Sequence, residues 1–180
     1  MIMYHGSIRE FEQFTKEMVV QNFSNDINTI GFWFTSDIQS AKPYAKGTET
    51  VFQKSETEFW EDGEPKVVEC DKEVNGFIYK VYMDDPNLKE YQSYDLFMSE
   101  RDNYCDYFGA KNKSLTWKDQ AILLNKEEAN SKLRKNLIKQ GYEGFVIRNT
   151  KQDNDVTDLY CIFSEDSIHI ANVVSVDVLQ

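Results

Sequence analysis

Cysteine, histidine and proline are scarce in this chain of 180 residues, which has three cysteines, two histidines and three prolines. The cysteines, Cys70, Cys105 and Cys161, form no Cys-x-x-Cys pair, and no histidine stands beside them in the sequence. Structural zinc sites and disulfide frameworks both need such clustering. We therefore expect no bound metal, and reduced thiols of the kind found in a cytoplasmic protein.

Long hydrophobic runs are also missing. Nowhere do about 18 apolar residues follow one another, and the N-terminus lacks a basic segment followed by an apolar run. Both absences argue against a membrane span and a signal peptide. We expect no membrane partner and a cytoplasmic location, which includes the cytoplasm of a host cell if another machine delivers the protein.

Several familiar chemical motifs do not occur. The sequence has no Gly-x-Gly-x-x-Gly after a strand, no phosphate-binding loop, no His-Glu-x-x-His and no Gly-x-Ser-x-Gly. With only His5 and His169, a Cys-His or Ser-His mechanism would depend on one of two histidines. His169 stands alone beside an apparent strand end, and we interpret it as a structural or surface residue.

The charge is one-sided, with 31 acidic and 20 basic residues and a formal net charge of -11. An acidic surface repels phosphate backbones, so a nucleic-acid partner is disfavoured, although a local basic patch could still bind one. Hydrophobic residues make up 41% of the chain and aromatic residues 14%, which excludes disorder. The length fits a single domain spanning residues 1–180.

Short apolar segments predict about six strands, and two regions predict helices. A Ser36-x-x-Gln39 capping pattern opens the first helix. The second is expected over 116–140, with a polar middle that could divide it. We interpret 46–75 as a long surface loop with room for a short hairpin, and 151–158 as a loop. Because strands and helices do not alternate regularly, the pattern favours an α+β fold. The expected strands are 2–4, 31–35, 76–83, 141–149, 159–164 and 171–179.

His5 lies in the segment "YHGS". A histidine taken alone is most simply a hydrogen-bonded core residue. Followed by Gly6 and Ser7, it offers ring nitrogens, a bare backbone that a flat ligand can approach, and a hydroxyl group. That combination suits a ribose and a carboxamide. The aromatic segment 31–45 can equally be a packed strand and helix, or can supply a ring that stacks on a heteroaromatic ligand.

Five segments, in this order, resemble the small transferase-like domains of bacteriophage polyvalent proteins. These belong to the ADP-ribosyltransferase fold, in the diphtheria-toxin and poly-ADP-ribose-polymerase branch with its His-Tyr-Glu pattern. The resemblance implies an ADP-ribosyltransferase-like split antiparallel β-sandwich with inserted helices, and a site that takes NAD as its substrate. The segments are "YHGS" (4–7), "GFWFTSDIQSAKPYA" (31–45), "IYKVYMDDPNL" (78–88), "GYEGFVIRNT" (141–150) and "LYCIFSEDSI" (159–168).

The resemblance also implies roles for single residues. His5 matches the histidine that hydrogen-bonds the nicotinamide ribose, Gly6 the glycine whose backbone holds the carboxamide, and Ser7 a hydroxyl residue near the adenosine ribose. Tyr44 falls where a tyrosine sandwiches the nicotinamide ring. Trp33 replaces the tyrosine of the motif; it keeps an aromatic face, but its N–H cannot act as a phenol acceptor.

Leu159 stands where the family has its catalytic glutamate, whose carboxylate supports the positive charge that develops on the ribose. Asp158 is next in sequence and could substitute for it through a bulge or a one-residue register shift. Otherwise, transfer of a single ADP-ribose unit would rely on an acidic acceptor, or the site would bind without reacting. Glu143, Glu165 and Asp166 are expected to be solvated turn residues.

From these matches we expect a mono-ADP-ribosyltransferase, a glycosyltransferase that uses NAD to modify a host macromolecule, with His5 and Asp158 as catalytic residues. NAD would contact His5, Gly6, Ser7, Trp33, Tyr44 and Leu159. The acceptor is unknown, with a protein favoured, and the chain would act as a phage or bacterial effector or toxin. Two alternatives stay open: an NAD glycohydrolase toxin, and a non-catalytic module that binds a nucleotide or a partner.

Overall fold

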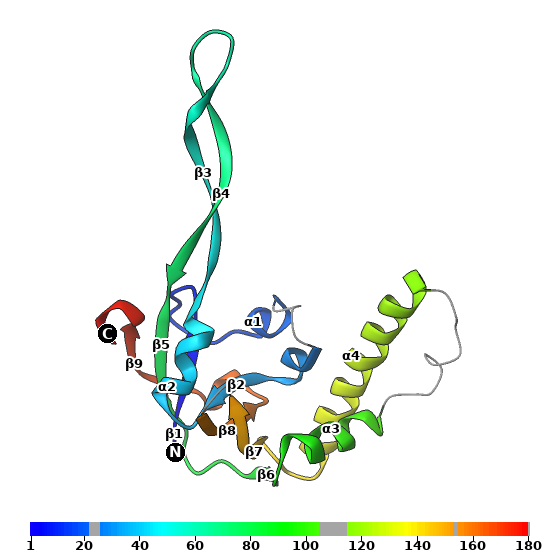
Figure 1. The fold of residues 1–180 in the computed structure, drawn as a ribbon. Coiled ribbons are helices and arrows are strands. Elements are labelled where there is room, and N and C mark those ends of the chain that lie inside the picture. The colour runs from blue at the N-terminus through cyan, green and yellow to red at the C-terminus, as the bar shows by residue number, and fades with distance from the viewer. Residues whose placement is uncertain (22–25, 105–114, 153–154, 180) are drawn as a thin grey trace.

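The computed structural model describes residues 1–21, 26–104, 115–152 and 155–179. Its centre is a seven-stranded sheet in the order β6-β7-β8-β2-β1-β5-β9 (Figure 1). The neighbouring strands are antiparallel except β6 and β7. The fold is therefore α+β, as the sequence predicted. The strands of this sheet are β1 (Ile2–Ser7), β2 (Phe32–Thr35), β5 (Phe77–Tyr82), β6 (Leu88–Tyr91), β7 (Gly144–Gln152), β8 (Asp155–Ile162) and β9 (His169–Ser175).

The sheet forks between β2 and β1. Every residue of β1 has a partner on β5, whereas β1 and β2 share one register pair, Tyr4 with Thr35. One half-sheet thus contains β6, β7, β8 and β2, and the other contains β1, β5 and β9. Below, "the fork" means the place beyond the Tyr4–Thr35 pair where β1 and β2 separate.

Three hydrophobic clusters hold the strands and helices together. The inner core joins both half-sheets, because it takes Met3 from β1, Phe34 from β2, Tyr79 from β5 and Tyr160 from β8. Phe14, from the segment after β1, fills the space between them and is only 6% exposed. Burial of these rings supplies the main attraction between the two halves.

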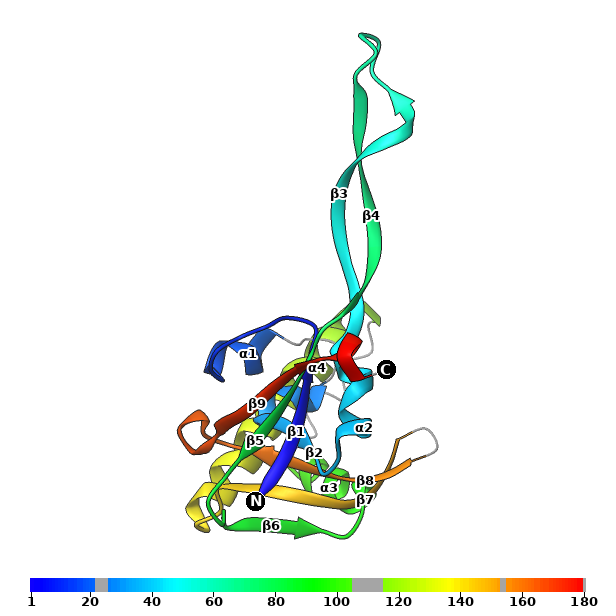
Figure 2. The same ribbon diagram turned by 90° about the vertical axis from the view of Figure 1, so that its left-hand side faces the viewer.

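The outer core covers the opposite face of the four-stranded half. There Phe145 and Cys161 pack under α3 (Tyr94–Asp102), α4 (Leu115–Lys139) and the 3-10 turn η1 (Asp26–Ile30), which supply Phe97, Leu133 and Ile30. Figure 2 shows the two helices on one side of the sheet. A third, smaller cluster packs α2 (Ile38–Ala41) and η2 (Lys42–Ala45) on the outside of β1 and β5. The remaining helical pieces are α1 (Lys16–Gln21), η4 (Glu165–Ser167) and η5 (Val176–Leu179).

Two helix predictions need correction. Helix α4 runs without interruption, because Ala129, Leu133 and Leu137 keep one buried face at helical spacing through the polar stretch. The cap of α2 is Asp37 rather than Ser36: the Asp37 side chain accepts from the backbone N–H groups of Gln39 and Ser40. The strand β6 and the helix α3 were not predicted.

The largest correction concerns residues 46–75. They form a two-stranded hairpin, β3 (Lys46–Phe59) paired with β4 (Pro65–Asn75), which projects from the sheet (Figure 1). The sequence indicated at most a short hairpin, because exposed polar residues stand on both faces along most of the ribbon and the alternation of apolar and polar residues is confined to part of β4. The stretch 151–158 is also mostly strand, since β7 continues to Gln152 and β8 begins at Asp155. The last strand, β9, begins at His169, earlier than expected, and ends at Ser175.

We predict that the hairpin can be removed without unfolding the sheet, because none of the three clusters contains a residue of β3 or β4. Replacing residues 48–73 by Asn-Gly between Gly47 and Val74, which face each other in the register, gives a two-residue turn. The free energy of unfolding should change by less than about 1 kcal/mol, or about 3 °C in Tm. Urea and thermal denaturation measure both quantities.

Phe14→Ala is the matching positive control, because it deletes a ring from the inner core and should cost roughly 3–5 kcal/mol. A deletion variant as unstable as Phe14→Ala would contradict the independence of the hairpin.

Candidate functional site

Three segments that lie far apart in the sequence meet at the fork. Residues 4–7 belong to β1, residues 32–35 to β2 and residues 159–162 to β8, and these strands are neighbours in the order β8-β2-β1. The register aligns Tyr4, Thr35 and Leu159 in one row across them. The segments picked out in the sequence therefore form one continuous strip of the sheet.

His5 lies on the inner face of this strip. Its ring is in edge or tilted contact with Phe11, Phe14, Phe34 and Tyr79, at centroid separations of 5.3–6.3 Å. Its Nδ1 lies 2.8 Å from the backbone oxygen of Trp33. A carbonyl oxygen can only accept, so Nδ1 carries a hydrogen and donates it. In addition to the Tyr4–Thr35 pair, this bond ties β1 to β2.

The protonation of His5 follows from the same surroundings. Burial lowers the pKa of His5, and the hydrogen bond to Trp33 opposes that effect only in part. The ring is then neutral at neutral pH, with its hydrogen on Nδ1 and a lone pair on Nε2. Nε2 can therefore accept a hydrogen bond from a hydroxyl group but cannot donate one.

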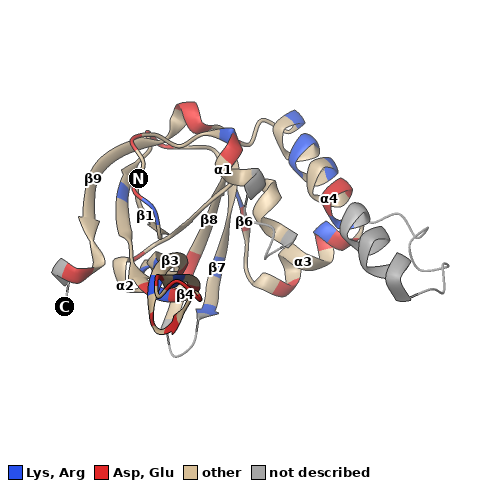
Figure 3. Cartoon of the chain, turned by 90° about the horizontal axis from the view of Figure 1, so that it is seen from above, with Lys and Arg blue, Asp and Glu red and all other residues tan. Residues whose placement is uncertain are grey.

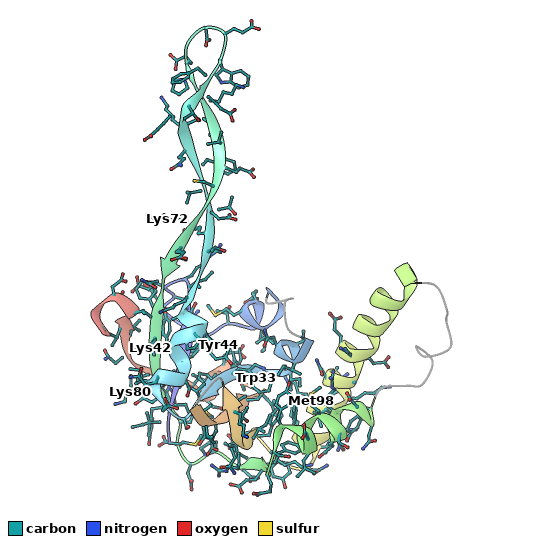
Figure 4. The ribbon with its side chains drawn as sticks, viewed as in Figure 1. Trp33, Lys42, Tyr44, Lys72, Lys80 and Met98 are labelled. Carbon is teal, nitrogen blue, oxygen red and sulfur yellow. The ribbon has the colours of Figure 1, made fainter. Side chains whose placement is uncertain are left out.

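Gly6 allows η2 to approach β1 closely. A Cβ atom on Gly6 would lie 2.2 Å from the Ala41 carbonyl oxygen, 2.8 Å from the Ala45 nitrogen and 2.9 Å from the Tyr44 Cβ. Only glycine fits there. Tyr44, the next site residue, is 54% exposed and stands above β2 in Figure 4. The structure thus brings Gly6 and Tyr44 together.

Ser7 uses its hydroxyl group locally. The Oγ atom donates to the Arg9 carbonyl oxygen at 2.8 Å and accepts from the Arg9 N–H at 3.2 Å. These bonds fix the turn in which β1 ends.

Trp33 and Leu159 point away from His5. Side chains alternate between the two faces of a strand, and paired positions share a face. Trp33, opposite Cys161, packs edge-on against Phe97 and Phe145 in the outer core, and its Nε1–H donates to the Ile27 carbonyl oxygen. Leu159 is buried in the same core. Neither side chain shares a face with His5.

Asp158 is held by an ion pair. Its Oδ2 accepts from Arg148 Nη1 at 2.7 Å, and its Oδ1 accepts from the backbone N–H of Asn149 at 3.0 Å. Arg148 also pairs with Glu90 on β6, and these two carboxylates raise the pKa of Arg148. Asp158 lies two residues before Tyr160, so it falls on the inner side of the strand. Its carboxylate is nevertheless committed to Arg148.

A polar cluster that the sequence did not reveal links α2 to β8. The Asp37 carboxylate accepts from Ser40 Oγ at 2.7 Å and from Thr157 Oγ1 at 3.1 Å. Partial burial acts to raise the pKa of Asp37, but the hydrogen bonds, from Ser40 above all, outweigh it and lower that pKa. The sequence could have indicated Asp37 as a helix cap, but not its contact with Thr157, because that residue lies 120 positions later in the chain.

These positions bring some candidates together and separate others. Gly6 and Tyr44 meet on the outside of β1, whereas the His5 ring lies on its inner face. Ser7 closes the turn after them, Asp158 is salt-bridged, and Trp33 and Leu159 support the outer core. Within the described residues, no group of three His, Cys, Asp or Glu side chains could hold a metal ion. In the same ranges, no helix is both long and apolar enough to cross a membrane.

Comparison with protein-family models, with curated proteins and with solved structures found no match to this chain.

We predict that Gly6→Ala destabilises the protein, because its new methyl group meets backbone atoms of η2. The expected cost is roughly 1–3 kcal/mol. Gly63→Ala is the control for backbone strain without a clash: no atom lies within 4 Å of its Cβ position, and its φ of +83° should cost roughly 1–2 kcal/mol. Urea denaturation compares the two. Unchanged stability of Gly6→Ala would mean that η2 moves away without cost.

The lowered pKa of His5 predicts a dependence of stability on pH. Because the folded pKa lies below the ordinary value of 6.5, the unfolded chain binds this proton more readily than the folded chain. The free energy of unfolding should therefore fall as the pH drops below about 6.5, until the folded pKa is reached. His5→Asn removes the titrating ring but keeps an amide that can donate to Trp33.

Unfolding curves between pH 7.5 and pH 5 measure the difference. The wild type should lose more stability than His5→Asn over this interval, and His169→Asn, at an exposed position, should follow the wild type. Parallel curves for the wild type and His5→Asn would contradict a half-buried, neutral His5.

Proposed function

We propose that this chain binds NAD at the fork and transfers a single ADP-ribose unit from it to a host macromolecule, with a protein as the favoured acceptor. The observation that carries the proposal is the state of His5 beside Gly6. A neutral imidazole with a lone pair on Nε2 offers an acceptor for a ribose hydroxyl. Gly6 would contribute its backbone N–H and C=O groups to a carboxamide, since η2 fills the space beside its Cα.

The chemistry proposed for this site is a substitution at the anomeric carbon of a ribose. The C1'–N bond breaks and nicotinamide leaves with the electron pair, while an acceptor nucleophile forms the new bond to C1' and gives up its proton. His5 would orient the ribose, the backbone of Gly6 the carboxamide, and the exposed ring of Tyr44 would stack on the nicotinamide. Orientation of this kind can supply much of a rate enhancement.

The site offers no free carboxylate among the candidate residues to stabilise positive charge on the ribose. Leu159 has no carboxylate and lies in the outer core, and the carboxylate of Asp158 is neutralised by Arg148. Preorganised negative charge is usually a large contribution to such reactions. These two observations favour a second candidate, a non-catalytic module that binds NAD or a related nucleotide. A third, an NAD glycohydrolase, differs only in giving ADP-ribose to water.

NAD binding tests the proposal directly. We predict that isothermal titration calorimetry detects NAD binding to the wild type, and that His5→Asn weakens it by about tenfold, the value of one lost hydrogen bond of about 1.4 kcal/mol. This variant keeps the donor to Trp33 but has no atom at the position of Nε2. His169→Asn should bind like the wild type. Absence of binding, or equal binding to His5→Asn, would refute the site.

Reaction products separate the three candidates. Incubation with adenine-labelled NAD and a cell lysate should give a labelled macromolecule if the chain is a transferase. Free ADP-ribose without labelled macromolecule indicates the glycohydrolase, and binding with unchanged NAD indicates the non-catalytic module.

A further inference from the structure

The hairpin β3–β4 leaves one strand edge open in line with the main sheet. On the main sheet, β5 pairs with β9 up to Phe77 and Ser175, and the Val176 N–H then donates to the Gly76 carbonyl oxygen at 3.0 Å. There the chain after β9 turns into η5, while β4, which leads into β5, extends away from the sheet (Figure 1).

The outer edge of β4 carries no strand among the described residues, since the hairpin forms a sheet of two strands in the order β3-β4. An isolated two-stranded hairpin is only marginally stable in water, and an unpaired edge presents a row of N–H and C=O groups to other chains. Figure 4 shows the hairpin side chains standing clear of the rest of the structure. An added strand would continue the line of β9.

The two faces of β4 differ in chemistry. Glu69, Asp71 and Glu73 are exposed on one face, while Val68 and Cys70 are half-buried on the other. The register places Cys70 opposite Val51, which extends the apolar face onto β3. In the part of the chain that the structure describes, a hydrogen bond from Thr50 Oγ1 to Asp71 at 2.9 Å holds the acidic row.

Charge restricts what can lie along this edge. Residues 46–75 contain nine acidic residues and four lysines, a net charge of -5, and Figure 3 shows both signs on the hairpin viewed end-on. A second copy paired edge to edge would set acidic rows against each other, which is destabilising. Nucleic acid would be repelled.

We propose that the outer edge of β4 binds an extended segment of a partner protein in which basic and apolar residues alternate. The segment adds as a third strand: its backbone completes the ladder, its basic side chains lie beside Glu69, Asp71 and Glu73, and its apolar side chains cover Val68 and Cys70. This site does not depend on the proposed NAD chemistry.

A nine-residue peptide of alternating lysine and valine, with acetylated and amidated ends, is the probe. It should bind the full chain in fluorescence anisotropy and slow hydrogen exchange of the β4 amides. Two further peptides serve as comparisons: one with the same composition in blocks, and one with N-methyl groups on alternate residues, which cannot form the ladder. Each should bind at least about tenfold more weakly.

Matched variants separate the edge from general attraction between charges. Glu69→Lys, Asp71→Lys and Glu73→Lys together should weaken binding of the alternating peptide at least about tenfold. Glu56→Lys, Glu61→Lys and Glu64→Lys change the net charge equally at other exposed hairpin positions and should weaken binding much less.

The proposal is overturned by any of three results: no binding of the alternating peptide, equal binding of the N-methylated peptide, or equal losses in the two triple variants. If the first triple variant disturbs the hairpin, comparing the binding of the alternating and the N-methylated peptides to the wild-type protein still tests whether the segment adds as a strand. Dimerisation through this edge without peptide binding would identify a second copy as the occupant instead.

Discussion

The single backbone pair between Tyr4 and Thr35 is the constraint on which the rest of the structure depends. A ladder this short contributes about 1 kcal/mol, far too little to hold two half-sheets together. The halves are joined instead by packing in the inner core, where Phe14 lies between rings from both sides, and by the bond from His5 to the Trp33 oxygen. A substitution that removes a ring from the inner core therefore weakens the contact between the two half-sheets, even where every strand stays intact.

His5 has a structural role, and the proposed ligand-binding role would use the same ring. As a structural residue it must stay neutral and donate to β2, and its aromatic neighbours favour that state by excluding water. As a ligand-binding residue it must leave Nε2 accessible. The two roles use different nitrogens, so one tautomer satisfies both. Gly6 also has a structural role, because the close approach of η2, which sets Tyr44 against the outside of β1, requires a residue without a side chain.

The sequence was most informative where apolar and aromatic residues cluster, and least informative where burial depends on distant partners. The strands around Phe34, Val81 and Ile162 were predicted because their side chains fill cores on at least one face. The hairpin could not be recognised as a long one, because a ribbon with solvent on both faces leaves only a short hydrophobic period, here within β4. Which face of the sheet Trp33 and Leu159 occupy could be known only from the strand register, because a shift of one residue would move both side chains to the face of His5.

The arrangement of acids at β8 restricts any reaction at the fork. Freeing Asp158 would leave Arg148 with Glu90 alone and would give up two charge-assisted bonds, so its carboxylate is not readily released toward a ligand. If the chain transfers ADP-ribose, orientation and long residence of the acceptor must then replace the missing negative charge. A docked segment on the hairpin would raise the local concentration of its own protein near the sheet. The lack of a carboxylate at Leu159 and the open strand edge on β4 would both suit a slow transfer directed to a docked partner, as proposed above.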